Sequence, residues 1–247
     1  MKLELYEKSI IGSRDDQQDC CASSLCTNTA FAAVCDGMGG TNGGAVASRT
    51  ATERMMSMYR AKEPLEGYPD FFLRSIDVLD ESIVAIQRNP GFEGAGTTIV
   101  AAAIDGSELY WLSVGDSRLY ILRGSEIIQV TRDHNFALCL GQWGETELRT
   151  AKAINNSLYA EMLISFIGIG GIRIYDNNRT AFELCPGDMV LLTTDGLTKA
   201  LDDREIHHIL TSNSPHEGMD ILFRRATAKS NKSQDNTTCV LIAVRSW

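Results

Sequence analysis

Four aspartates beside apolar runs are the residues of this sequence best suited to chemistry. Asp36 follows AFAAVC, Asp116 follows LYWLSVG, Asp195 follows MVLLTT, and Asp235 stands just before a final apolar run. Taken singly, each is most simply a turn residue, because Asp-Gly is among the commonest turn dipeptides. Taken together, carboxylates at one sheet edge would repel one another unless they were protonated or bound to cations. Oxygen ligands without His or Cys favour Mg²⁺ or Mn²⁺ over zinc.

Two other features allow alternative chemistry. The glycine-rich run GMGGTNGG stands before an expected helix and could form a phosphate-binding nest in a nucleotide-binding enzyme. It lacks the Gly-Lys-Ser/Thr of a P-loop, so we interpret it mainly as a tight turn. His134, after Asp133, is either a general acid or a structural histidine.

The composition is that of a folded protein with an acidic surface. The chain has 247 residues, 44% of them hydrophobic and 22% charged, and a net charge of −9. This balance argues against disorder and against nucleic acid as a main partner. Phosphate binding remains open to an acidic chain if metal cations supply the positive charge.

The cysteines and the apolar stretches bear on location. Seven cysteines are scattered with no CxxC pair, which favours buried free thiols in a reducing cytosol. The N-terminus MKLELYEKSI has no apolar core of a signal peptide, and the apolar stretch 162–172 is too short to span a bilayer. We therefore expect a cytoplasmic protein without a membrane partner.

Strands and helices cluster along the chain without regular βαβ alternation. Apolar patterns predict strands at 2–10, 31–35, 97–104, 109–114, 118–123, 127–131, 189–194 and 238–244. Helical spacing predicts helices at 44–61, about 69–88, 202–211 and 215–229. This order indicates an α+β fold with antiparallel sheets in a single domain over 1–247. Residues of about 135–160 are expected to be a flexible surface segment.

Six short blocks occur in order along nearly the whole chain. They are RDDQQD from Arg14, DGMGG from Asp36, GAGTT from Gly94, GDSR from Gly115, DGL from Asp195 and DN from Asp235. Each is weak alone, but together they resemble the signature of the metal-dependent Ser/Thr protein phosphatases, the PPM or type 2C class, in their bacterial form. The resemblance implies a sandwich of two antiparallel β-sheets flanked by helix pairs, in α/β/β/α layers. The segment 135–160 then stands in the place of the family's variable flap.

The resemblance also implies a set of metal ligands for two core Mn²⁺ or Mg²⁺ ions. Asp36 matches the carboxylate that bridges the two ions, and the Gly37 carbonyl matches a ligand of one of them. Asp195 and Asp235 match carboxylates that complete the other ion. Asp19 matches a residue that contacts water bound to the metals.

Further roles carry over by the same resemblance. Asp116 matches a ligand of a third, weaker metal, and Arg14 matches the arginine that grips the substrate phosphate. Asn236 is expected to orient Asp235. Gln18 departs from a frequent glutamate, and Met38 departs from a histidine that some relatives carry as a suspected acid.

The implied function is a protein phosphatase that hydrolyses phosphoserine and phosphothreonine with metal-activated water. The implied partners are phosphoprotein substrates and a Ser/Thr kinase with its targets, in signalling. The alternative is an adaptor of the same fold that binds phosphoproteins without hydrolysing them. Retention of Asp36, Asp195 and Asp235 favours the enzyme, because degenerate relatives usually lose metal aspartates.

Overall fold

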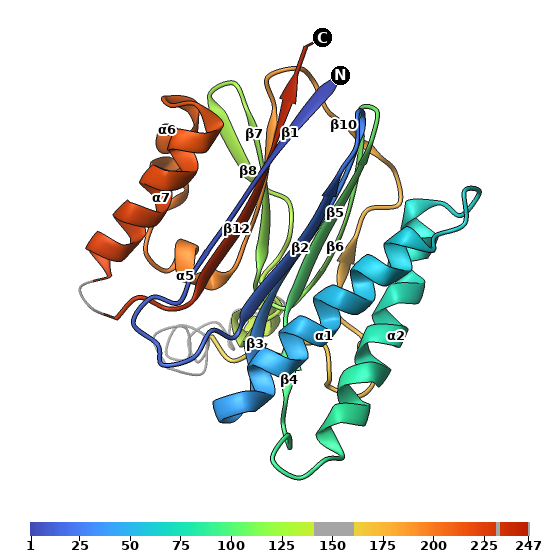
Figure 1. Ribbon diagram of the computed structural model, residues 1–247. Helices are drawn as coiled ribbons and strands as arrows, with labels where there is room; N and C mark the ends of the chain where they lie inside the picture. Colours follow the sequence, from blue (N-terminus) through green and yellow to red (C-terminus); the bar gives the residue numbers. More distant parts are fainter. Residues whose placement is uncertain (141–160, 231–232, 247) are drawn as a thin grey trace.

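Two antiparallel β-sheets lie face to face between two pairs of helices in the computed structural model (Figure 1). The structure describes residues 1–140, 161–230 and 233–246. Every strand pairing in these ranges is antiparallel. The prediction of an α+β sandwich in four layers is therefore confirmed.

The first sheet has five strands in the order β1-β12-β11-β7-β8. Their bounds are β1 Lys2–Ile10, β7 Arg118–Arg123, β8 Glu126–Gln129, β11 Met189–Thr193 and β12 Thr237–Arg245. The second sheet has the order β10-β6-β5-β3-β2, with β4 on β3 and β9 on β6. Its strands are β2 Asp19–Leu25, β3 Thr29–Met38, β4 Gly96–Thr97, β5 Ile99–Asp105, β6 Glu108–Val114, β9 Asp176–Asn177 and β10 Phe182–Glu183.

The helices cover the outer faces of the sheets. Helices α1 (Gly40–Arg60) and α2 (Tyr68–Gln87) pack on the second sheet, and α6 (Asp203–Thr211) and α7 (Pro215–Lys229) pack on the first (Figure 1). Two short helices, α3 (Phe136–Leu140) and α5 (Asp195–Thr198), lie near the strand ends. No helix among the described residues is long and apolar enough to cross a bilayer.

The central residues of strand β3 are apolar because both faces of the strand are buried. Phe31 and Cys35 face the helices α1 and α2, whereas Ala32 and Val34 face the other sheet. Because successive side chains of a strand point to opposite faces, a strand buried on both sides cannot alternate with polar residues. Asp36 thus ends the apolar part of a strand that is fixed from both faces.

Helix α1 begins at Gly40, four residues after Asp36 of β3. A Cβ on Gly37 would lie 2.1 Å from the Gly44 carbonyl oxygen, so the strand and the helix can approach this closely only with glycine there. The opposite helix α6 begins conventionally, with Asp202 and Glu205 forming a capping box. The glycine-rich run is therefore a tight junction, as expected.

Most predicted elements agree with the structure to within a few residues. Helix α1 begins at Gly40, four residues before the predicted start at 44, the predicted strand 97–104 is divided into β4 and β5, and the elements β2, β9, β10 and α5 were missed. Within the expected segment 135–160, residues 136–140 form α3, and 141–160 lie outside the described residues. The expectation of buried thiols holds for Cys35 and Cys239, but it is wrong for Cys26 and Cys185, which are exposed.

Candidate active site

The predicted site residues come together in one cleft at the ends of the strands. The cleft has a volume of about 1110 Å³. Its walls include six of the residues selected from the sequence: Arg14, Asp36, Gly37, Asp116, Asp195 and Asp235. The seventh, Asp19, is not part of the wall and is only 6% exposed.

Asp19 and Asp36 form the deepest part of the acidic cluster. They are directly opposite each other on β2 and β3. One carboxylate oxygen of Asp19 accepts a hydrogen bond from the Thr194 hydroxyl at 2.8 Å. The backbone amide of Asp36 donates to the Thr98 hydroxyl at 3.0 Å. Both aspartates are therefore held by strands rather than by loops.

Crowding of carboxylates changes the acidity of this cluster. Burial, together with the charges of Asp19 and Asp195, raises the pKa of Asp36 well above its ordinary value. Burial is also the main cause that raises the pKa of Asp19 to about 7, against hydrogen bonds that lower it. The pKa of Asp116 rises to about 7 because of burial and the nearby charge of Asp195. Without added positive charge, the cluster favours protonated carboxyls.

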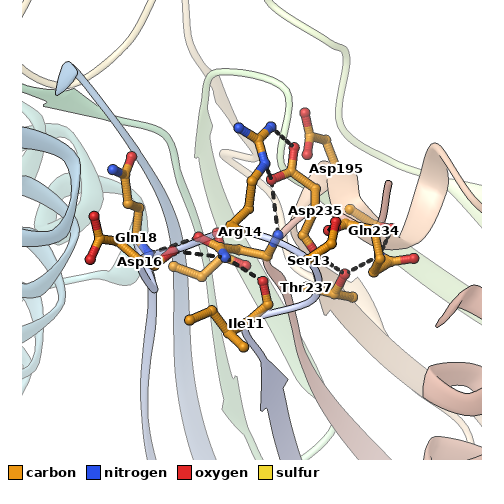
Figure 2. A network of polar contacts seen from close by, with 12 residues as sticks. Ile11, Ser13, Arg14, Asp16, Gln18, Asp195, Gln234, Asp235 and Thr237 are labelled. Atoms are coloured by element: carbon orange, nitrogen blue, oxygen red, sulfur yellow. Dashed lines mark hydrogen bonds and ion pairs between the residues drawn. The ribbon is translucent and has the colours of Figure 1, made fainter. Parts of the chain in front are cut away.

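Asp195 and Asp235 differ because each faces a cation. Lys199 Nζ lies 2.5 Å from Asp195 Oδ2, one turn further along the chain. Arg14 contacts both carboxylate oxygens of Asp235 at 2.8 Å, as the paired dashed lines of Figure 2 show. The Arg14 side chain stays 61% exposed, so it can also be reached from the cleft.

The loop that carries Arg14 is held by Asn236. The Asn236 amide donates to the carbonyls of Ile11 and Asp16 and accepts from the Gln18 amide at 2.8 Å. The Asn236 backbone N–H donates to the Asp235 carboxylate at 2.9 Å. Asn236 therefore contacts Asp235 as expected, but through its backbone, and its side chain positions the arginine loop.

Asp116 follows Gly115 at the turn between β6 and β7. Gly115 has a φ of 108°, and a Cβ there would lie 2.6 Å from Thr98 Cγ2, so only glycine fits. His134 contacts this turn but is fully buried and is not part of the cleft wall. The general-acid alternative for His134 is therefore wrong, and its structural role is confirmed.

The donor set of the cleft suits a hard divalent cation. Asp19 Oδ1 and Asp195 Oδ1 are buried and have no hydrogen-bond partner among the described residues. Unpaired buried carboxylate oxygens are costly unless a cation binds them. No three His, Cys, Asp or Glu side chains form an all-protein cage in the described part of the chain. Mg²⁺ and Mn²⁺ need none, since Mg²⁺ commonly binds one or two carboxylates and keeps several waters.

Sequence reasoning gave no role to two cationic residues of the cleft wall, Lys199 and Arg118. Arg118 is bound to Asp133 by two hydrogen bonds of 2.8 and 2.6 Å, so its charge is neutralised locally. The available signal for Lys199 was its position four residues after Asp195, which brings side chains together once a helical turn forms. Met38 and Gln18, the two departures noted above, also line the cleft.

The fold and the cleft define a class: an antiparallel α/β/β/α sandwich with an acidic cluster and an exposed arginine at the strand ends. The sequence profile of the family Protein phosphatase 2C matches residues 8–237. Serine/threonine phosphatase stp of Listeria welshimeri is 30% identical over 220 residues, covering 87% of this chain and 84% of that protein. The chain therefore belongs to the protein phosphatase 2C family.

Two solved phosphatase structures match this chain over nearly its whole length. The Streptococcus agalactiae serine/threonine phosphatase has a TM-score of 0.84 and 26% identity, covering 98% of this chain and 100% of that one. The catalytic domain of the serine/threonine protein phosphatase PstP, in complex with two manganese ions, has a TM-score of 0.78 and 26% identity, covering 99% of both chains. The resemblance drawn from the six sequence blocks is confirmed.

Proposed function

We propose that this protein hydrolyses phosphoserine and phosphothreonine in other proteins and depends on Mn²⁺ or Mg²⁺. The observation that carries the proposal is the convergence of Asp36, Asp116, Asp195 and Asp235 with Arg14 in one cleft. Relatives named as Ser/Thr phosphatases and a manganese-bound structure of the same fold support it.

The acidic cluster would hold two core cations, with the Asp36 carboxylate and the Gly37 carbonyl among their ligands. Asp195 and Asp235 would complete the second site, and Asp116 would serve a weaker third one. Asp19 would contact water bound to the ions. Bound Mn²⁺ or Mg²⁺ supplies a Lewis acid that lowers the pKa of water and offsets negative charge on a phosphoryl group.

Arg14 would bind the phosphate. A guanidinium matches two oxygens of one phosphate as a fork, and its fixed charge stabilises the phosphoryl oxygens during transfer. In the structure this fork is engaged by Asp235. Substrate phosphate would therefore compete with Asp235 for Arg14, and Asn236 keeps the loop in place while this exchange occurs.

Two alternative functions inferred from the sequence, a nucleotide-binding enzyme and a phosphoprotein adaptor, fit the structure less well. A nucleotide-binding enzyme built on GMGGTNGG would be expected in a βαβ arrangement, whereas the described pairings are all antiparallel. An adaptor that only binds phosphoproteins has no need of a crowded acidic cluster, which destabilises the metal-free site.

The deciding experiment is hydrolysis of a phosphothreonine peptide by the purified full chain with Mn²⁺, with and without excess EDTA. We expect phosphate release with Mn²⁺ and its loss with EDTA. Binding of the phosphopeptide without phosphate release, at saturating Mn²⁺, would instead support the adaptor. Full activity in EDTA with no metal detected by elemental analysis would contradict the metal-dependent mechanism.

The remaining expectations are part of the same proposal. We propose that the whole chain 1–247 is one catalytic unit, that it acts in signalling opposite a Ser/Thr kinase, and that it is cytoplasmic. The free thiols Cys20, Cys21, Cys26 and Cys185, all at least partly exposed, support a reducing compartment. Comparison of phosphoprotein levels in cells with and without the protein would test the signalling role.

A further inference from the structure

The buried residue His134 forms hydrogen bonds with the turn that carries Asp116. The Gly115 amide donates to His134 Nδ1 at 3.1 Å, and the His134 amide donates to the Gly115 carbonyl at 2.9 Å. His134 thus bonds to both backbone groups of the residue directly before Asp116. The ring is 0% exposed, so water does not compete for these bonds.

The hydrogen bond fixes how the ring must be protonated. Because Nδ1 accepts the Gly115 N–H, a neutral ring must carry its proton on Nε2. His134 Nε2 lies 3.6 Å from Asp176 Oδ2, which is too long for a direct hydrogen bond but close enough for electrostatic attraction. Nε2 has no hydrogen-bond partner among the described residues.

Asp176 is itself held in place. Its carboxylate accepts hydrogen bonds from the Arg132 backbone at 2.6 Å and from the Arg132 guanidinium at 2.9 and 2.5 Å. Burial would raise the pKa of Asp176, but its interactions with His134 and Arg132 lower it to about 2. A fixed negative charge therefore faces Nε2 and stabilises the Nε2–H form of the ring.

The same turn is tied to the core of the acidic cluster on its other side. The hydroxyls of Thr98 and Ser117 lie 2.7 Å apart, and Thr98 also accepts from the Asp36 amide. The positive φ of Gly115 and its close contact with Thr98 leave the turn little freedom. The position of Asp116 relative to Asp36 is thus set by two supports, Thr98 and His134.

We propose that His134, kept in its Nε2–H form by Asp176, is a positioning residue that holds Asp116 in place for its part in catalysis. The proposal rests on the proposed function for its kinetic consequence. Its structural part, the protonation of the ring, stands independently. The competing explanation is that His134 only fills the core and adds stability.

The first test reads the ring directly. Long-range ¹H–¹⁵N spectra of the metal-free full chain, with His134 assigned by its loss in a His134→Asn variant, should show the Nε2–H tautomer. In Asp176→Asn the population of this tautomer should fall. A wild-type ring in the Nδ1–H tautomer would overturn the proposal whether or not the protein is a phosphatase.

The second test separates positioning from packing by kinetics on the phosphothreonine peptide. His134→Leu fills the space without an acceptor, and kcat should fall by about 10–100-fold with KM within about twofold. His134→Asn places an acceptor oxygen near the position of Nδ1, and kcat should return to within about threefold of the wild-type value. Calorimetric Mn²⁺ titration should show the tight binding unchanged in both variants.

The third test is non-additivity. Asp116→Ala should reduce kcat by a similar factor, and the double variant with His134→Leu should be no slower than Asp116→Ala alone, because both changes remove one function. Additive losses, or a His134→Leu variant with wild-type kcat and only a lower Tm, would assign His134 to packing.

If His134→Leu does not fold, Asp176→Asn takes its place in the cycle. Non-additivity of Asp176→Asn with Asp116→Ala then supports the proposal, and additivity overturns it. Absence of hydrolysis by the wild-type chain would refute the proposed function, and the spectra would still decide the tautomer.

Discussion

The carboxylates of the cleft fall into two groups that differ in how their charge is balanced. Asp195 and Asp235 face Lys199 and Arg14 at 2.5 and 2.8 Å. Asp19, Asp36 and Asp116 form no ion pair within the described ranges, and their pKa values are raised, mainly by burial. The unpaired group depends on cations from solution, whereas each carboxylate of the paired group must share or exchange a side-chain cation when a metal or a phosphate binds.

The largest effect on activity is expected from Asp36, a member of the unpaired group. Asp36→Asn removes a charge that would be shared by both core ions, and we expect kcat on a phosphothreonine peptide to fall on the order of 10³-fold or more. The measurement is steady-state kinetics at saturating Mn²⁺, with bound metal counted by elemental analysis.

A matched control is Asp105→Asn, since Asp105 also precedes a glycine but is the exposed last residue of β5, at the far end of β3 from Asp36. This control should keep wild-type activity. An Asp36→Asn variant that retained most of its kcat would refute the bridging role.

In the paired group, Arg14 should matter for substrate more than for metal. Arg14→Ala should reduce kcat/KM by about 10–1000-fold, because one charge-assisted clamp on the phosphate is lost. Mn²⁺ affinity, measured by calorimetry, should not weaken, since removing a positive charge beside Asp235 frees that carboxylate. Arg74→Ala, which breaks an exposed ion pair with Glu66, serves as the control. Weakened Mn²⁺ binding with normal kcat/KM would show that Arg14 only organises the loop.

The unpaired group should also give the metal-free protein an unusual pH dependence. A carboxyl whose pKa is higher in the folded state favours folding below its unfolded pKa, and that stability is lost as pH rises through the folded pKa. For Asp19 the window runs from about 4 to about 7. In EDTA, Tm should therefore fall between pH 5 and pH 7.5 by roughly 5 °C or more, and Mn²⁺ should reverse the fall.

The variant Asp19→Asn should flatten part of this slope, because the carboxyl that titrates is gone. Asp105→Asn should leave the slope as it is. A metal-free Tm that is constant or rises over this range, measured by differential scanning fluorimetry, would count against the electrostatic account of the cluster.

Only part of the fold and of the cleft could be predicted from the sequence. Strands such as β12 and the strand-end aspartates were predictable, because apolar runs and their ends are local signals. Strand β2 was missed because its sequence DCCASSL mixes small and polar residues, and most of its positions are only partly buried. The second role of Asn236, in holding the arginine loop, was missed because its amide binds the loop at Ile11 and Asp16, about 220 positions away in the chain. The pairing of Lys199 with Asp195 required the turn of α5, which is four residues long.

The smallest predicted effect concerns the ion pair between Lys199 and Asp195. Lys199 Nζ occupies one oxygen of Asp195, while the other oxygen is buried without a partner in the described structure. A cation that binds Asp195 must therefore share the carboxylate with an ammonium group or displace it. The Lys199 side chain is 50% exposed, so solvent weakens the ion pair and its effect should be modest. Lys199→Met keeps the length of the side chain and removes the charge, and we expect Mn²⁺ to bind about 2–5-fold more tightly by calorimetry.

Lys229→Met is the matched control, because Lys229 forms a comparable exposed ion pair with Glu205 outside the cleft. It should leave Mn²⁺ affinity unchanged. Weaker Mn²⁺ binding in Lys199→Met would mean that the ammonium group orients Asp195 for the metal instead of competing with it. The distinction between paired and unpaired carboxylates would then need revision, because Lys199 would act as part of the metal site rather than as a substitute for the metal.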